Sequence, residues 1–342
     1  MADFAGVAQS NAARAVPMQR AIPLDSPLEW KQALSGIPHS FFHTWEHSYA
    51  MHLTHRLPAY LYCAESEGVR VVCPFIERPI GEYVDIATPY GFSGFAGNGD
   101  IPGLPPYWEQ FVHSRGYVSA FIALHPLFFR SGYTRAEETH ELKSLYFLDL
   151  SLEAEELLRR CSEKRRLFIR KWEKKGIAIV TDRRQLTRFA LDNYQGFFGR
   201  KRAGPSYNIR PVTIQFLLSL ENVLTIGAVR EGRIEAFHLS SYTPYAAESF
   251  FYFDMPGAES RCISLIWEAA KRLGDIGIGA FSLGGGLEDG DAIDEFKRRF
   301  GAERRPLRAL KQVIQPETYA RLCAGVGVDP DDRKGYFPAY RA

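Results

Sequence analysis

The sequence has 342 residues, of which 46% are apolar and 24% charged, which is typical of a soluble globular protein with room for two packed domains. The formal net charge of +2 excludes a basic field over the whole molecule, so any contact with a polyanion must come from local clusters. Five scattered cysteines, without CxxC or zinc-type spacing, indicate buried reduced thiols in a cytoplasm.

Residues 1–21 are predicted to form a flexible N-terminal tail. The stretch is rich in alanine and polar residues and lacks the continuous apolar segment of a signal peptide. The apolar stretch Tyr117–Phe129 is broken by His125 and Pro126 and is too short to span a membrane as a helix. We therefore expect a cytoplasmic protein without a transmembrane segment.

Residues 22–150 are predicted to form a first α/β domain. Two helices begin it, one after Ser26 and one around Phe41–Met51. The strands Ala59–Glu65 and Val69–Ile76 follow as a hairpin, because Ser66-Glu67-Gly68 joins them as a turn. The later predicted elements are a glycine-rich turn closing Tyr83–Gly94, a helix at Trp108–Ser114, and strands at Tyr117–Leu124 and Glu141–Leu148. This order, without regular βαβ alternation, favours a mixed sheet.

Histidines crowd one segment of this domain. They are His39, His43, His47, His52 and His55. Pairs at i, i+4 or i, i+3 on a helix could bind a metal. However, the segment lacks the HExxH arrangement, and imidazoles flanking Trp45 explain the cluster equally well. We assign no metal.

Residues 151–177 are predicted to form a basic helical crossover. Leu158, Cys161, Phe168 and Trp172 share one face, and lysines and arginines fill the remainder. The candidates for a phosphate-binding surface are Arg165, Arg166, Arg170, Lys171, Lys174 and Lys175. A solvated charged face is the alternative interpretation.

Residues 178–305 are predicted to repeat the plan of the first domain. The expected helices are Asp182–Phe198, Val212–Ser219 and Ser260–Gly274, and the expected strands are Ile177–Thr181, Val223–Arg230, Ile234–Tyr242, Glu248–Asp254 and Gly277–Leu283. Helices followed by an antiparallel meander, then a helix and a strand, resemble a GNAT acyltransferase domain. A short helix at Pro316–Ala324 follows near the C-terminus.

Three motifs together resemble the FemABX-like transferases. They are Thr88–Gly94 (TPYGFSG), Arg165–Gly176 (RRLFIRKWEKKG), where Trp172 replaces a more usual small residue, and Phe281–Gly301, which contains Gly284-Gly285-Gly286, Phe296-Lys297 and Phe300-Gly301. The resemblance implies an α/β fold with mixed sheets in two tandem GNAT-like domains. It further implies that residues from about 306 to 342 return to the first domain, formed by 22–150, and that 151–305 form the second.

The resemblance also implies the donor, an aminoacyl-tRNA, with no separate cofactor. Met255–Cys262 stands where GNAT enzymes carry a glycine-rich pyrophosphate loop, but it holds a single glycine and an acidic residue. The expected activity is amide formation with an amine acceptor, which could be a small molecule, a peptide or a cell-envelope precursor. The alternatives are an acyl-CoA-dependent N-acyltransferase acting on a sugar or amino acid, and a non-catalytic RNA-binding relative.

Lys297 is the main catalytic candidate, because it matches the lysine of the family's "FK" motif and could contact the donor ester. The alternative is an exposed lysine beside Arg298 and Arg299. Tyr252 and Asp254 close a predicted strand and could orient an amine, although core packing and turn capping explain them as well. The sequence lacks Gly-x-Ser-x-Gly and an evident Ser/His/Asp order, which favours direct transfer over an acyl-enzyme.

Further residues are candidates for donor or acceptor binding. They are Tyr90, Ser93, Tyr207, Arg210, His238, Gly285, Gly286 and Phe296. Tyr90 and Ser93 would line an interdomain cleft, and Tyr207 and Arg210 could hold a phosphate or carboxylate. His238 lies between Phe237 and Leu239, and a core histidine is the simpler interpretation.

Overall fold

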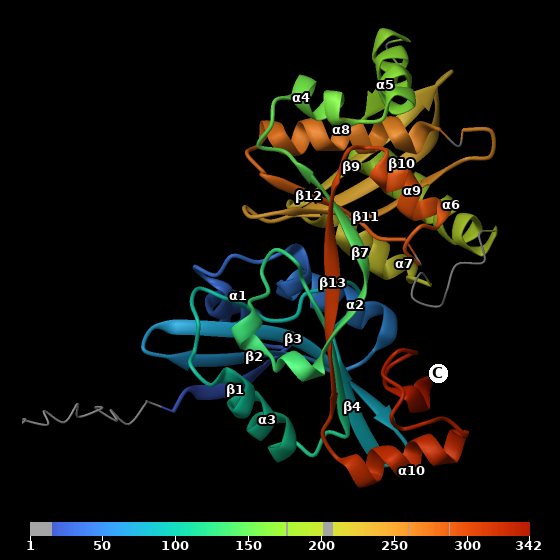
Figure 1. The fold of residues 1–342 in the computed structure, drawn as a ribbon. Coiled ribbons are helices and arrows are strands. Elements are labelled where there is room, and N and C mark those ends of the chain that lie inside the picture. Colours follow the sequence, from blue (N-terminus) through green and yellow to red (C-terminus); the bar gives the residue numbers. More distant parts are fainter. Residues whose placement is uncertain (1–15, 176, 201–207, 259, 287) are drawn as a thin grey trace, which may run out of the picture.

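The computed structural model describes residues 16–175, 177–200, 208–258, 260–286 and 288–342 (Figure 1). Within these residues a single mixed sheet runs through the molecule in the order β1-β2-β3-β4-β6-β13-β7-β12-β11-β10-β9-β8, and β5 pairs with β3. The sheet is continuous across both halves of the molecule. The predicted fold class, α/β with mixed sheets, is confirmed.

The two halves of the sheet follow the same plan. The first half holds β1 (Met18–Pro23), α1 (Pro27–Leu34), α2 (Trp45–His55), β2 (Ala59–Ser66), β3 (Val69–Ile80), β4 (Tyr83–Ala87), β5 (Ala96–Gly97), α3 (Leu104–Ser114) and β6 (Ser119–Leu124). The second holds β8 (Ala178–Val180), α6 (Arg183–Arg200), α7 (Pro211–Ser219), β9 (Val223–Arg230), β10 (Arg233–Tyr242), β11 (Ala247–Asp254), α8 (Arg261–Asp275) and β12 (Ala280–Gly284). Each half has an antiparallel meander, a helix and a final parallel strand, which pairs as β4·β6 and β11·β12.

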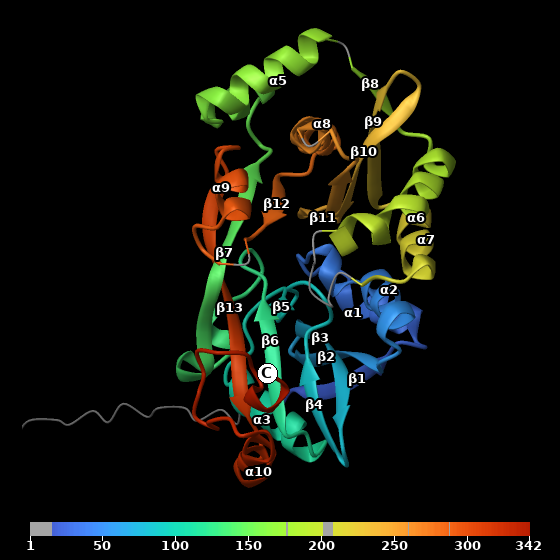
Figure 2. The ribbon, with the colours of Figure 1, turned by 90° about the vertical axis from the view of Figure 1, so that its right-hand side faces the viewer.

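Two long strands are exchanged between these halves. β7 (Thr139–Asp149) follows the first half in sequence but pairs with β12 of the second, whereas β13 (Glu303–Val313) follows the second half and pairs with β6 of the first. The two strands also pair with each other, from Glu303 opposite Phe147 to Leu310 opposite Thr139. Figure 2 shows them running side by side from one half of the molecule into the other. The exchange explains why one sheet spans both halves.

The halves also share a core between α2 and α7. Phe42 and Met51 of the first half belong to the same buried cluster as Leu217 and Phe250 of the second. Thr213 of α7 donates to the Ala50 carbonyl of α2 at 3.1 Å. The relative placement of the halves is therefore fixed by packing as well as by the strands.

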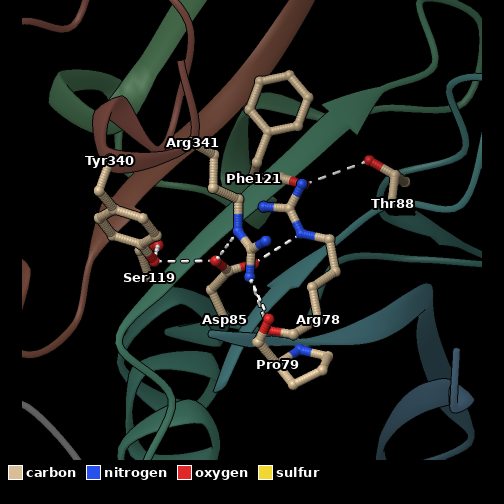
Figure 3. A network of polar contacts seen from close by, with 8 residues as sticks. All are labelled: Arg78, Pro79, Asp85, Thr88, Ser119, Phe121, Tyr340 and Arg341. Carbon is tan, nitrogen blue, oxygen red and sulfur yellow. Dashed lines mark hydrogen bonds and ion pairs between the residues drawn. The ribbon is translucent and has the colours of Figure 1, made fainter. Parts of the chain in front are cut away.

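The chain after β13 packs against the first half. α10 (Pro316–Val326) is followed by a short 3₁₀ helix at Ala339–Arg341, and Tyr319 and Tyr340 pack against Val118. Asp85, fully buried on β4, accepts from Arg78 Nε and Arg341 Nε, each at 2.6 Å, and from the Tyr340 hydroxyl at 2.9 Å (Figure 3). This network fixes the C-terminal segment to β3 and β4.

Three elements differ from the sequence predictions. Met18–Ala21, predicted as part of the tail, lie in β1, which pairs with β2. The basic crossover is two helices, α4 (Ala154–Arg160) and α5 (Glu163–Lys175), because the Ser162 amide donates to the Arg299 carbonyl at the junction. β13 was not predicted as a strand, because its first half reads as a basic, proline-containing loop.

Candidate functional site

The candidate site is built around the glycine turn, Gly284–Gly286, at the end of β12. β11 and β12 pair only at Ala247–Glu248 and Phe281–Ser282, and the turn follows where this pairing has ended. A Cβ on Gly285 would lie 2.3 Å from the Ser144 carbonyl oxygen, and one on Gly286 would lie 2.4 Å from a carboxylate oxygen of Asp291. Only glycine allows this approach of the turn to β7 and to the start of the next helix.

Lys297 extends into this turn from α9 (Ala292–Arg298). Asp291 caps the helix by accepting from the Asp294 amide at 2.7 Å. Lys297 is only 7% exposed, and its Nζ donates to the Gly285 carbonyl at 2.6 Å. Burial, reinforced by the charge of Lys143, lowers the pKa of Lys297 to about 7. This lysine is therefore not the exposed residue of the alternative interpretation.

Aromatic rings connect α9 to the end of β11. The rings of Tyr252 and Phe296 stack with centroids 6.1 Å apart. The guanidinium of Arg165 lies 4.7 Å from the ring centroid of Phe296 and 4.2 Å from that of Phe300, and its Nη2 donates to the Phe296 carbonyl. Burial lowers the pKa of Arg165 to about 10. Tyr252, Phe296 and Lys297 thus belong to one packed group.

Arg165 differs from its predicted place on the basic surface. It is 5% exposed, because it lies on the face of α5 that also buries Ile169 and Trp172. The other candidates on this helix lie outward: Arg170, Lys171, Lys174 and Lys175 are exposed and Arg166 is half-buried. Arg165 thus attaches the basic helix to the helix that carries Lys297.

Asp254 lies half-buried at the end of β11, two residues after Tyr252. Burial, together with the Asp254 carboxylate, raises the pKa of the Cys262 thiol well above its usual value. The Cys262 thiol is therefore protonated beside Asp254 near neutral pH.

Of the remaining candidates, His238 lies beside the site: its ring centroid is 6.0 Å from that of Tyr252 and 6.2 Å from that of Phe281. Tyr90 packs on Phe250 of β11, with centroids 5.9 Å apart, and Ser93 is buried after β4. His238 is fully buried, its Nε2 lies 3.0 Å from the Ser249 hydroxyl, and burial lowers its pKa to about 3. Arg210 is exposed at the start of α7, and its amide donates to Thr54 of α2. Tyr207 lies outside the described residues.

The structure adds site residues that sequence reasoning missed. Lys143 of β7 donates from Nζ to the Gly286 carbonyl at 2.7 Å. Tyr146 of the same strand is buried, and burial with the Asp294 carboxylate raises its pKa to about 12. Asp289 accepts from the Ser144 amide at 2.9 Å and also pairs with Arg304. Lys143, Tyr146 and Arg304 belong to no motif, because the exchanged strands β7 and β13 bring them to the turn, whereas Asp289 lies within Phe281–Gly301 but was not singled out there.

Two further findings concern the predictions on metals and membranes. In the part of the chain that the structure describes, no three His, Cys, Asp or Glu side chains are grouped so as to hold a metal ion. Of the clustered histidines, His43 and His47 are fully buried, and burial lowers the pKa of His47 to about 3. No described helix is both long and apolar enough to cross a bilayer.

Comparison with known proteins identifies the fold. No family profile and no curated protein sequence matches this chain. Among solved structures, FemX superposes with a TM-score of 0.66 at 11% identity, covering 89% of this chain and 99% of FemX. L-PGS from Bacillus licheniformis gives 0.53 at 13% identity, covering 83% and 91%. The C-terminal domain of a putative lysylphosphatidylglycerol synthetase from Agrobacterium fabrum gives 0.51 at 16%, covering 80% and 90%. The chain therefore shares the fold of FemX, which agrees with the fold expected from its three motifs.

Proposed function

We propose that this protein is an aminoacyltransferase that forms an amide bond between the aminoacyl group of a charged tRNA and an amine acceptor. The acceptor would be a small molecule, a peptide or a cell-envelope precursor. The proposal is supported by the shared fold with FemX and with lysylphosphatidylglycerol synthetase domains, and by the residues around Lys297.

The choice of aminoacyl-tRNA over acyl-CoA as the donor rests on the loop after β11, where three backbone amides are already hydrogen-bonded within the protein. The Met255 amide donates to the Glu235 carbonyl at 2.8 Å, the Ala258 amide to Met255 at 2.9 Å, and the Arg261 amide to Ala258 at 2.9 Å. A pyrophosphate loop needs such amides free at the start of a helix. Because these donors are already engaged, an aminoacyl-tRNA fits this site better than acyl-CoA.

The basic helix α5 supports the same donor. Its exposed lysines and arginines supply the charge that attracts a nucleic-acid backbone. Arg165 joins this helix to α9 through Phe296 and Phe300. A tRNA acceptor end held along α5 would thus be anchored to the element that carries Lys297.

In the proposed reaction the acceptor amine attacks the ester carbonyl carbon, and the bond to the ribose oxygen of the tRNA breaks. The amine loses one proton and the ribose oxygen gains one. Lys297, with a pKa of about 7, populates both charge states near neutral pH. It can therefore donate to the carbonyl or leaving oxygen when charged, or accept the amine proton when neutral.

The test of the donor is binding of mixed charged tRNA against acetyl-CoA, by filter retention and calorimetry across a salt series. We expect salt-sensitive tRNA retention with no heat from acetyl-CoA. Saturable acetyl-CoA binding without tRNA retention would instead support the acyl-CoA-dependent enzyme.

The test of catalysis is release of radiolabelled amino acid from tRNA into amide products, one amino acid at a time, against a panel of amine acceptors. K297A should lose turnover and still retain tRNA. K311A is the matched control, because Lys311 is also buried and donates to backbone carbonyls, those of Arg333 and Gly335, after β13. Retention of tRNA without turnover by the wild-type protein on any acceptor would favour the non-catalytic RNA-binding relative.

A further inference from the structure

Two lysines hold the glycine turn from two different elements. Lys143 Nζ on β7 donates to the Gly286 carbonyl at 2.7 Å, and Lys297 Nζ on α9 donates to the Gly285 carbonyl at 2.6 Å. The two carbonyls belong to consecutive residues, and the charge of Lys143 contributes to the lowered pKa of Lys297, so the two ammonium groups interact. Both side chains are at least partly buried, where like charges interact strongly.

The charges around Lys297 come from each element packed on the turn. α9 and its cap contribute Asp294 and Asp291, β7 contributes Lys143 and Tyr146, the loop before α9 contributes Asp289, and β13 contributes Arg304. Asp289 and Arg304 form an ion pair with each other. Lys143 is then the cation that lowers the pKa of Lys297, whereas the carboxylates of Asp291 and Asp294 raise it.

We propose that Lys143 is a positioning residue of the transfer site: it holds the Gly286 carbonyl in place and, through its charge, sets the protonation state in which Lys297 works. The proposal rests on the proposed function of Lys297. Without the Lys143 charge, burial alone would oppose the effect of the Asp291 and Asp294 carboxylates, and Lys297 would hold its proton to higher pH. Lys143 itself is not required to touch a substrate.

The experiment is an NMR titration of the full chain labelled with ¹³C,¹⁵N-lysine, with Lys297 identified as the signal missing from K297R. We expect the titration midpoint of Lys297 to move to higher pH by roughly one unit in K143M. The midpoint should stay at the wild-type value in K143R, which keeps the charge, and in K311M, which removes a buried lysine elsewhere on β13. Should K143M not fold, K143Q replaces it, since Gln keeps a donor for the Gly286 carbonyl.

An unchanged midpoint in the neutral variant would overturn the proposal, and so would equal shifts in K143M and K143R, since packing and not charge would then be the cause. The titration uses neither tRNA nor acceptor. Failure of tRNA binding would therefore reject the proposed function while the midpoint still reports on Lys143.

Once an acceptor is identified, the pH–rate profile provides the second measurement. The limb that belongs to Lys297 should move to higher pH in K143M, whether the rate rises or falls along it. A variant that had only loosened the turn would lower the rate at every pH and leave that limb in place.

Discussion

His125 of the first half donates from Nε2 to Oε1 of Glu248 in the second half, at 2.8 Å, and both side chains are buried. The Leu127 amide donates to His125 Nδ1, which places the proton on Nε2. Glu248 stands opposite Ser282 at the last paired position of β11 and β12, just before the glycine turn. The contact therefore joins the loop after β6 to the base of the candidate site.

We expect E248A to lower the free energy of unfolding by about 3 kcal/mol, because it leaves the buried imidazole N–H without an acceptor. Urea unfolding monitored by circular dichroism measures the change. E303A, which removes an exposed glutamate from β13, is the control and should change stability by less than about 0.5 kcal/mol. A loss below about 1 kcal/mol in E248A would show that the pair contributes little to joining the halves.

K297M should change the pH dependence of stability. The folded-state pKa of Lys297, about 7, lies below that of an unfolded lysine, so the unfolded chain binds more protons between these values. The wild-type protein therefore gains stability as pH rises from about 7 to about 10, and this gain should be absent in K297M. The difference, on the order of 3 kcal/mol or less, is measured by urea unfolding at several pH values. Parallel stability curves for the two proteins would contradict the lowered pKa.

G285A should disrupt the glycine turn, because its Cβ would lie 2.3 Å from the Ser144 carbonyl oxygen. We expect a loss of stability of about 2 kcal/mol or more. Gly279 lies in the same segment, and a Cβ added there would have no heavy atom within 4 Å, so G279A provides the control. Equal melting temperatures for G285A and G279A would mean that the glycine turn accommodates the added Cβ without a loss of stability.

R341A should detach the C-terminal segment from the first half. Arg341 donates to Asp85 and to the carbonyls of Arg78 and Pro79, so we expect a loss of about 2 kcal/mol and faster proteolysis after β13. R321A, on the exposed side of α10, is the control. Proteolysis at the wild-type rate would show that the Tyr319 and Tyr340 packing suffices.

Replacement of Lys171, Lys174 and Lys175 by alanine should weaken tRNA binding and reduce the slope of log K against log salt, by up to about one unit per lysine that contacts a phosphate. Filter binding at several salt concentrations measures the slope. K334A removes an exposed lysine from the C-terminal segment and should leave it unchanged. An unchanged slope in the triple variant would place the tRNA elsewhere.

Local patterns in the sequence predicted most helices and the hairpins, because alternation and turn residues are short-range signals. The strand β13 was not predicted because Arg304, Arg305 and Pro306 are not typical of a strand. They lie in one because β13 pairs with β7 on one side and β6 on the other. The end of α4 was missed for the same reason, since the partner of Ser162 lies at Arg299.

The motif match identified Lys297 and the glycine turn, but not their surroundings. The burial of Lys297 and the approach of Lys143 depend on strand exchange, which leaves no local sequence pattern. Arg165 was predicted on the basic surface because nearby residues of α5 are also basic, and its burial follows from aromatic partners more than 130 residues away.

The strand exchange also sets an order for folding during synthesis. When the ribosome has completed residue 150, β6 still lacks β13 as its neighbour, and β7 has neither β12 nor β13 beside it. The first half cannot complete its part of the sheet until residue 313 has left the ribosomal exit tunnel, and until then it presents an open strand edge. A gene fragment that encodes either half alone would retain such an edge permanently, so we expect both fragments to aggregate unless they are produced together.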